Sequence, residues 1–314
     1  SCRWFAPEGG RSARAAVIRV LLLALAGAGI AAVAAASASP AAQGGWLFAT
    51  FRGEATPMSE QIHFGLSSDG LRWSALNRGN PVLVSAIGER GVRDPYLLRS
   101  ADGAKFYLLA TDLSINLDRN WTRASRAGSK SIVIWESDDL VKWSAPRLVR
   151  VAPDDAGCAW APEAIYDDRT GDYLVYWAST TARDDFAKQR IWAAHTADFR
   201  KFSPPRIYIE KPDNVIDTDI IRAGAGYYRF SKDDRNKDIT MEAADQVDGP
   251  WSEVPGFALD VPLGTRRHLE GPAAFQLAPP TPEGKDGTWC LLLDDPGRGY
   301  QAFMTTDLAS GKFT

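Results

Sequence analysis

The stretch Ser67–Ser74 reads SSDGLRWS, and the chain returns to this pattern about once in every 50–70 residues. Two close copies are Ser137–Ser144 (SDDLVKWS) and Thr196–Ser203 (TADFRKFS), and two weaker ones are Ala244–Ser252 and Thr306–Thr314. The anchoring aromatic residues fall at positions 73, 143, 202, 251 and 313, so the intervals are 70, 59, 49 and 62 residues. Self-similarity at such a period indicates a repeat architecture.

Two short apolar segments, joined by a turn that usually contains glycine, precede four of these copies. Apolar runs of four to six residues between turns are typical of buried strands. The paired segments are Asp94–Arg99 with Phe106–Ala110, Pro162–Tyr166 with Tyr173–Trp177, Asp217–Arg222 with Tyr227–Phe230, and Glu270–Phe275 with Thr288–Leu292.

A third apolar segment follows these pairs, as in Lys130–Trp135 and Arg190–Ala194. One unit therefore holds about four strands. A lone four-stranded sheet leaves one face uncovered, and radial stacking covers it. We predict an all-β fold, a five-bladed β-propeller of four-stranded antiparallel blades. A β-sandwich with coincidentally similar turns is the alternative.

The first and last repeats look incomplete. The first begins at Trp46–Phe51 with no upstream strand for the axis of the propeller, and the last stops at Thr314. We therefore expect the chain to be a fragment whose closing strand lies beyond residue 314, so that closure of the ring is incomplete.

The composition is that of a globular, aromatic-rich protein. The 314 residues are 45% hydrophobic and 24% charged, and they include 11 Trp, 9 Tyr and 13 Phe. Disordered, collagen-like and coiled-coil classes are excluded. The formal net charge is −3, and no run of Lys and Arg is interleaved with aromatic residues. This balance argues against a nucleic-acid partner, which calls for a basic surface.

The amino-terminal segment has the features of a secretory signal. Arg11, Arg14 and Arg19 precede an apolar, alanine-rich stretch that leads to the small-residue triplet Ala36–Ala38. We assign residues 1–38 to a signal peptide, 39–45 to a short linker and 46–314 to the propeller, which predicts a secreted or periplasmic protein with no membrane contact after cleavage. An uncleaved membrane anchor is the alternative, although Ala, Gly and Ser make the second half weakly hydrophobic.

The cysteines are too few to form a disulfide scaffold, and cysteines and histidines together do not define a zinc site. Cys2 leaves with the signal, and Cys158 and Cys290 lie in apolar surroundings, so we expect two buried free thiols. The three histidines are scattered, and no zinc-type Cys/His spacing exists. No cofactor is required for the chemistry predicted below. Whether a structural calcium ion lies on the axis is left open, and no metal-binding residue is assigned.

Carboxylates stand at the start of the strands expected to line the axis. Asp94 precedes Pro95, Asp217 follows Ile216, and Glu270 precedes a Gly-Pro pair. In a propeller the first strand of each blade lines the central channel, so acids at these starts can converge on one pocket. Three acids from three blades form a candidate general-acid/base set. Each alone is more often a solvated turn residue.

The same residues carry a family resemblance. Arg93-Asp94-Pro95, Trp160-Ala161-Pro162-Glu163, Ile216-Asp217 and Leu269-Glu270-Gly271-Pro272 follow one another in an order and spacing similar to glycoside hydrolase family 43. That family consists of five-bladed propellers that cleave arabinofuranosides, xylosides, arabinan and some galactofuranosides. The resemblance spans about residues 46–314.

The resemblance implies an inverting glycosidase. Asp94 matches the base that activates water, Glu270 the acid that protonates the leaving oxygen, and Asp217 the carboxylate that raises the pKa of the acid and orients it. An inverting pair needs roughly 6.5–9.5 Å between carboxyl groups, which residues on different blades can supply. Asp219 competes with Asp217, because alternation places both on one face of a strand. Thr218 stands where the family often has Pro.

Further residues are candidates for substrate contact. Trp160 offers an aromatic face for sugar stacking, with a place in the core between blades as the alternative. Glu163 and Asp219 are candidate pocket acids. Arg229 and His268 lie near axial strands and are candidates for binding sugar hydroxyls, with ordinary salt bridging as the alternative. The predicted partner is an oligosaccharide or polysaccharide, most simply with α-L-arabinofuranosyl or β-D-xylosyl linkages.

Three other functions fit parts of the pattern. A catalytically inactive carbohydrate-binding propeller would share the fold, because a fold does not fix a function. An invertase-like retaining enzyme also carries Arg-Asp-Pro, but that group has an upstream Asn-Asp-Pro and a Glu-Cys pair, and neither occurs here. A scaffold for protein partners would leave the three acids unexplained.

Overall fold

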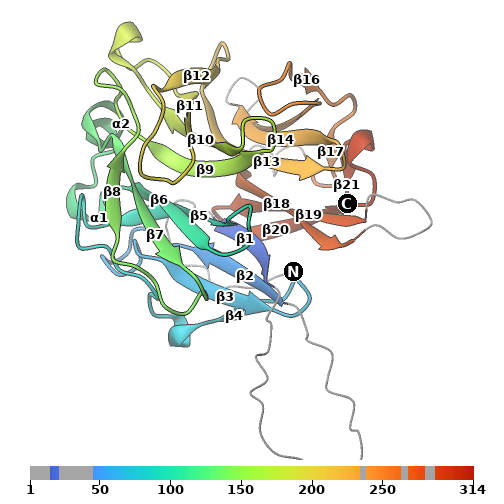
Figure 1. Cartoon of the computed structure of the whole chain (residues 1–314), viewed down its shortest axis with the longest axis horizontal. Helices are drawn as coiled ribbons and strands as arrows, with labels where there is room; N and C mark the ends of the chain where they lie inside the picture. Colours follow the sequence, from blue (N-terminus) through green and yellow to red (C-terminus); the bar gives the residue numbers. More distant parts are fainter. Residues whose placement is uncertain (1–14, 21–44, 234–237, 263–267, 280–286) are drawn as a thin grey trace, which may run out of the picture.

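A computed structural model describes residues 15–20, 45–233, 238–262, 268–279 and 287–314 of the chain. Its strands form five small antiparallel sheets set around a common centre (Figure 1). The prediction of an all-β, five-bladed propeller is confirmed, and the β-sandwich alternative is wrong.

The first three blades each hold four strands in sequence order from the inside outward. Blade one comprises β1 (Ala15–Val20), β2 (Gly45–Thr50), β3 (His63–Ser67) and β4 (Ser74–Ala75). Blade two comprises β5 (Val92–Arg99), β6 (Phe106–Asp112), β7 (Ser131–Ser137) and β8 (Arg147–Arg150). Blade three comprises β9 (Trp160–Asp167), β10 (Asp172–Ser179), β11 (Arg190–Thr196) and β12 (Arg206–Ile209).

The last two blades complete the ring. Blade four comprises β13 (Val215–Ala223), β14 (Gly226–Asp233), β15 (Asp238–Ala244) and β16 (Ser252–Glu253). Blade five comprises β18 (Glu270–Ala278), β19 (Thr288–Asp295) and β20 (Gly299–Thr305). Outside β20 lies β21 (Lys312–Phe313), where Met304 and Thr314 exchange backbone hydrogen bonds, and β21 also pairs in parallel with β17 (Ala258–Leu259).

Helices are short and lie in the connections. They are α1 (Ile115–Asp118), α2 (Trp121–Ala127) and the single 3₁₀ turns η1 (Asn77–Gly79), η2 (Ala182–Asp184) and η3 (Leu308–Ser310). In the part of the chain that the structure describes, no helix has the length and apolar character that crossing a membrane requires.

The inner position of blade one is occupied, which corrects the expectation of an open slot. Strand β1 pairs with β2 from Ala15 opposite Thr50 to Val20 opposite Gly45, and it lies beside β5 and β18. Its sequence is rich in β-branched Val and Ile, which favour strands. The signal-peptide assignment of residues 1–38 stays a prediction. Only Ala15–Val20 of that segment, and Gly45 of the linker, are among the described residues.

The repeated Ser/Thr-x-Asp turn closes the third strand of a blade. In blade three the Thr196 hydroxyl accepts the Phe199 N–H at 2.9 Å. The Asp198 carboxylate accepts the N–H groups of Arg200 and Lys201 at 2.9 and 3.0 Å. The residue after the aspartate, Phe199, has a positive φ of 54°. Blades one and two repeat these contacts through Asp69 and Asp139.

The aromatic residues that follow these turns pack between blades. Trp143 of blade two lies 5.9 Å from Phe64 of blade one, between ring centroids. In blade three, Phe202 packs against a buried cluster that also holds Tyr107 of blade two and Phe199, whose ring centroids are 4.3 Å apart. Phe313 of blade five contacts Phe230 of blade four edge-on at 5.8 Å. The repeat in sequence is thus a repeat of inter-blade contacts, which explains the high aromatic content.

We expect Asp198→Ala to lower the melting temperature at neutral pH and to lower it less in acid. The backbone donors lower the pKa of Asp198, so its stabilising effect is present above the ordinary carboxyl pKa and is lost as pH falls through the lowered folded value. Thermal unfolding from about pH 7 to pH 2 measures this. Asp168→Ala is the control, because its ion pair with Arg222 is on the surface. A pH-independent difference between Asp198→Ala and wild type would contradict the assignment.

Candidate active site

Each of four inner strands contains the same irregularity near its start. The register with the second strand shifts between Arg93 and Tyr96 in blade two, and equivalent shifts occur in β9, β13 and β18. Within each shift one residue has a positive φ: Asp94 at 48°, Ala161 at 48°, Asp217 at 53° and Gly271 at 56°. Such a bulge turns one side chain out of the regular alternation.

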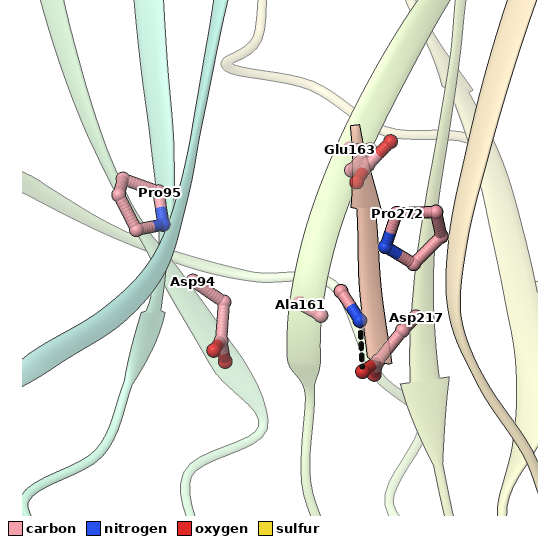
Figure 2. Close-up of a pocket in the computed structure, with 7 residues that line it drawn as sticks. Asp94, Pro95, Ala161, Glu163, Asp217 and Pro272 are labelled. Carbon is pink, nitrogen blue, oxygen red and sulfur yellow. Dashed lines mark hydrogen bonds between the residues drawn. The ribbon is translucent and has the colours of Figure 1, made fainter. Parts of the chain in front are cut away.

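These bulge residues meet in one pocket at the centre of the ring. The pocket has a volume of about 270 Å³, part of it open to solvent. Its lining consists of Asp94, Pro95, Ala161, Glu163, Asp217, Gly271 and Pro272, which come from four blades. Figure 2 shows the carboxyl groups of Asp94 and Asp217 pointing to the same side, with Glu163 farther along β9.

A hydrogen-bonded bridge through Thr111 connects Asp94 to the next blade. The Thr111 hydroxyl donates to Asp94 Oδ2 at 2.8 Å and accepts the Ala161 N–H at 2.7 Å. Thr111 is fully buried on β6, opposite Arg93. Because the backbone N–H occupies a lone pair of the hydroxyl, its proton is directed at Asp94. Asp94 Oδ2 is therefore the acceptor in this hydrogen bond.

Arg93 anchors the same segment from the other side. Its guanidinium lies 4.4 Å from the Phe51 ring and 5.2 Å from the Trp121 ring, and it pairs with Glu60 at 3.0 Å. Glu60 is completely buried and also accepts the Ser114 hydroxyl at 2.6 Å and the Ile115 N–H at 2.8 Å. This paired, fully hydrogen-bonded cluster fixes the chain directly before Asp94.

Asp217 is tied to blade five. It is 3% exposed, and its Oδ2 accepts the Gly271 N–H at 3.2 Å, the contact drawn in Figure 2. The buried Lys232 ammonium donates to the Leu269 carbonyl at 2.7 Å, two residues earlier on that blade. The start of β18, with Glu270 between these two contacts, is therefore held against blade four.

The structure refines the expectation that the three acids occupy equivalent points of the repeat. Asp94 and Asp217 are equivalent, whereas Glu270 stands one residue earlier in its strand, at the register position of Arg93 and Ile216. The bulge residue of blade five is Gly271. Glu270 is half-buried and is not among the residues that line the pocket, whereas the two residues after it, Gly271 and Pro272, do line it. Its role as the acid stays a prediction.

Glu163 and Asp219 lie together, one step farther along their strands. Glu163 lines the pocket and accepts the Tyr176 hydroxyl at 3.1 Å. Asp219 is 4% exposed, accepts the Ala274 N–H at 2.6 Å and shares a hydrogen bond with Glu163. Burial raises the pKa of Asp219 to about 7. Asp219 thus lies beside the pocket wall. Of the two competing aspartates, Asp217 and Asp219, it is Asp217 that lines the pocket.

Besides Asp219, three more of the proposed substrate-binding residues lie outside the pocket lining. Arg229 is buried, pairs with Glu242 at 2.6 Å and stacks 4.4 Å from the Trp251 ring, so the salt-bridge alternative describes it. His268 is exposed in the turn before β18. Trp160 is half-buried and contacts Trp121 edge-on at 6.1 Å. Its packing against apolar clusters favours the core alternative.

The expected thiols are present, and both cysteines in the described residues, Cys158 and Cys290, are free and buried. Burial raises the pKa of Cys158 to about 11, which keeps it protonated and unreactive. Within the described ranges no three His, Cys, Asp or Glu side chains gather as a metal site would require.

Comparison with known proteins identifies the class. A family described as a probable glycosyl hydrolase domain, related to glycoside hydrolase family 43, matches residues 42–314. The chain belongs to this family, and the family places it among the glycosidases.

One characterised relative and several solved structures narrow the comparison. An α-L-arabinofuranosidase of Bifidobacterium longum subsp. longum is 28% identical over 283 residues, which cover 79% of this chain but only 26% of the relative. An exo-β-1,3-galactanase of Phanerochaete chrysosporium has a TM-score of 0.58 at 14% identity, covering 85% of this chain and 60% of that one. An α-L-arabinanase of Penicillium chrysogenum has a TM-score of 0.56 at 17% identity, covering 86% and 77%. These two structures show the shared fold.

We expect Thr111→Val to reduce turnover without unfolding the protein. Valine keeps the shape of threonine but removes the donor to Asp94 and leaves the Ala161 N–H buried without its acceptor, a loss of about 1–3 kcal/mol in stability. Displacement of Asp94 should lower kcat by roughly 10- to 100-fold and change KM little. Thr111→Ser, which keeps the hydroxyl, should restore most of kcat. Equal losses in both variants would exclude the bridging role.

We expect Asp219→Asn to gain stability relative to wild type as pH rises. In wild type the unfolded chain releases this proton near the ordinary pKa of about 4, whereas the folded protein keeps it until about pH 7. The free energy of unfolding therefore falls between these two values and levels off above, by at most about 4 kcal/mol. Asparagine does not titrate. Chemical denaturation of both proteins from about pH 4 to pH 8 measures the difference, and a constant difference would rule out the raised pKa.

Proposed function

We propose that this protein is a secreted or periplasmic glycosidase that removes α-L-arabinofuranosyl groups with inversion of configuration. The observation that carries the proposal is the pocket at the propeller centre, where Asp94 and Asp217 project from different blades and the segment after Glu270 forms the adjoining wall. The choice of arabinofuranosyl follows the relative that is named for this activity. β-D-Xylosyl and galactofuranosyl linkages are the other substrates to test.

Asp94 is assigned as the base that activates water. It accepts the Thr111 hydroxyl, and the bridge to Ala161 fixes its orientation. In an inverting reaction the base removes a proton from water as the oxygen attacks the anomeric carbon. The water oxygen forms the new C–O bond, and the bond to the leaving oxygen breaks on the opposite face of the sugar.

Glu270 is assigned as the acid that protonates the leaving oxygen, with Asp217 as the carboxylate that orients the acid. Asp217 reaches the backbone of Gly271, directly after the acid, so the two are linked through one peptide unit.

The test begins with substrate turnover by the full chain. Aryl α-L-arabinofuranoside should be hydrolysed faster than aryl β-D-xyloside or aryl galactofuranoside. Asp94→Asn and Glu270→Gln should each lower kcat by about 10²–10⁴-fold, the usual contribution of general acid–base catalysis. Asp168→Asn, a surface change, should leave kcat unaltered. Near-normal rates in a folded Asp94→Asn or Glu270→Gln protein would refute the assignment.

The stereochemistry of the first product separates the two mechanisms. Proton NMR during early hydrolysis should show the β-anomer of arabinose released from an α-arabinofuranoside. Initial release of the α-anomer would mean retention, as in an invertase-like enzyme. Tight sugar binding with no turnover of any substrate would instead indicate a carbohydrate-binding propeller.

A further inference from the structure

A second polar layer lies directly beyond the bulge residues. The first regular pair after each register shift is formed by Tyr96, Glu163, Asp219 and Ala273 in four successive blades. Three of these four side chains can titrate, and the charges of Glu163 and Asp219 both contribute to the raised pKa of Tyr96. The three are therefore close to one another, although they come from three different blades.

Glu163 and Asp219 form the centre of this layer. Their side chains share a hydrogen bond. The Tyr176 hydroxyl donates to Glu163 Oε2 at 3.1 Å and accepts the Ile220 N–H at 3.1 Å, so its proton is directed at Glu163. Asp219 Oδ2 is held by the Ala274 N–H at 2.6 Å. Groups from β9, β10, β13 and β18 thus fix the two carboxyls against each other.

The two carboxyls differ in their access to solvent. Asp219 is 4% exposed, whereas Glu163 lines the pocket. A hydrogen bond between two carboxyl groups requires a proton, because two carboxylates are both acceptors and repel each other. The groups facing the pair are Tyr96 of β5, Tyr176 of β10 and the backbones of Ile220 and Ala274. The side chains among these are neutral or acidic.

We propose that Glu163 and Asp219 act as one unit that holds a single proton between them, and that Glu163 thereby presents a fixed hydrogen-bonding group to a hydroxyl of the sugar in the pocket. Glu163 is then a specificity-determining residue in addition to Asp94, Asp217 and Glu270. The proposal rests on the proposed glycosidase function for the identity of its ligand, a pentose in furanose or pyranose form.

The shared proton explains how a carboxyl can be oriented beside two other acids. Burial raises the pKa of Asp219 to about 7, and the hydrogen bond with Glu163 lowers this pKa in part. A single proton shared by the two groups gives the pair a net charge of −1 instead of −2. A pocket built to hydrogen-bond a hydroxyl discriminates strongly against a ligand that lacks it, by up to about 10⁴-fold, because its buried polar groups are left without a partner.

The first experiment detects the proton without any substrate. Infrared difference spectra between about pH 6 and pH 9 should show the C=O stretching band of a protonated carboxylic acid that disappears with an apparent pKa near 7. Both Glu163→Gln and Asp219→Asn should abolish this titrating band, because each removes one half of the pair. Asp168→Asn should keep it. A band that survives in either pair variant would overturn the shared proton.

The second experiment measures sugar binding, which does not need turnover. Calorimetry should show that Glu163→Gln weakens the binding of L-arabinose at least tenfold, and Tyr176→Phe severalfold. Among the monodeoxy analogues of arabinose, the one that lacks the hydroxyl contacted by Glu163 should bind wild type and Glu163→Gln with equal affinity. That analogue therefore identifies the hydroxyl. Affinity of wild type for D-xylose and D-galactose tests the sugar class.

The outcomes separate this proposal from the glycosidase function. Equal losses for arabinose and for every deoxy analogue in Glu163→Gln would overturn the hydroxyl contact, as would no binding of any of the three sugars by wild type. Infrared and binding results as expected, but with no hydrolysis of any aryl glycoside, would refute the proposed catalysis and leave the carboxyl pair in place as part of a sugar-binding site.

Discussion

The left-handed bulge at the start of the inner strands is the constraint from which the site follows. A regular strand alternates its side chains between two faces, and neighbouring blades cover both faces of the inner strands of a propeller. The positive φ at Asp94 and Asp217 breaks this alternation once and turns each carboxyl into the central pocket. Aspartate is among the non-glycine residues that tolerate this region best. The site therefore uses a backbone feature that the repeat supplies in four blades.

The hydrogen bonds that hold the site also hold the blades together. Thr111 joins blades two and three, Tyr176 joins blades three and four, and Asp217 and Asp219 each join blades four and five. Every one of these contacts ends on a backbone N–H, which is a fixed donor. Rotation of one blade against its neighbour would displace the carboxyls, so the precision of the pocket depends on the same contacts as the closure of the ring.

The sequence predicted the fold and the two bulge aspartates because both depend on local patterns that repeat. The Ser/Thr-x-Asp turns, the apolar segments and the acids before Pro or after Ile are readable one residue at a time. Thr111 and Tyr176 carry no such signal, since each looks like an ordinary strand residue and acquires its role only through a neighbouring blade. The inner strand Ala15–Val20 was missed because this segment, which contains Arg19, was assigned to the positively charged part of a signal peptide. The ion pair of Arg229 with Glu242 could not be predicted, because proximity to an axial strand does not reveal such a partner.

The offset of Glu270 from the bulge position suits an inverting site. If the acid occupied the bulge of blade five, it would enter the pocket from the same level as Asp94 and Asp217, and three carboxylates would compete for one small space. Gly271 occupies that place instead, and its N–H serves Asp217. Glu270 begins its strand one residue earlier, at the register position of Arg93 and Ile216. Under the proposed assignment, the base and the acid therefore come from different register positions of different blades, and inversion requires a separation of roughly 6.5–9.5 Å between their carboxyl groups.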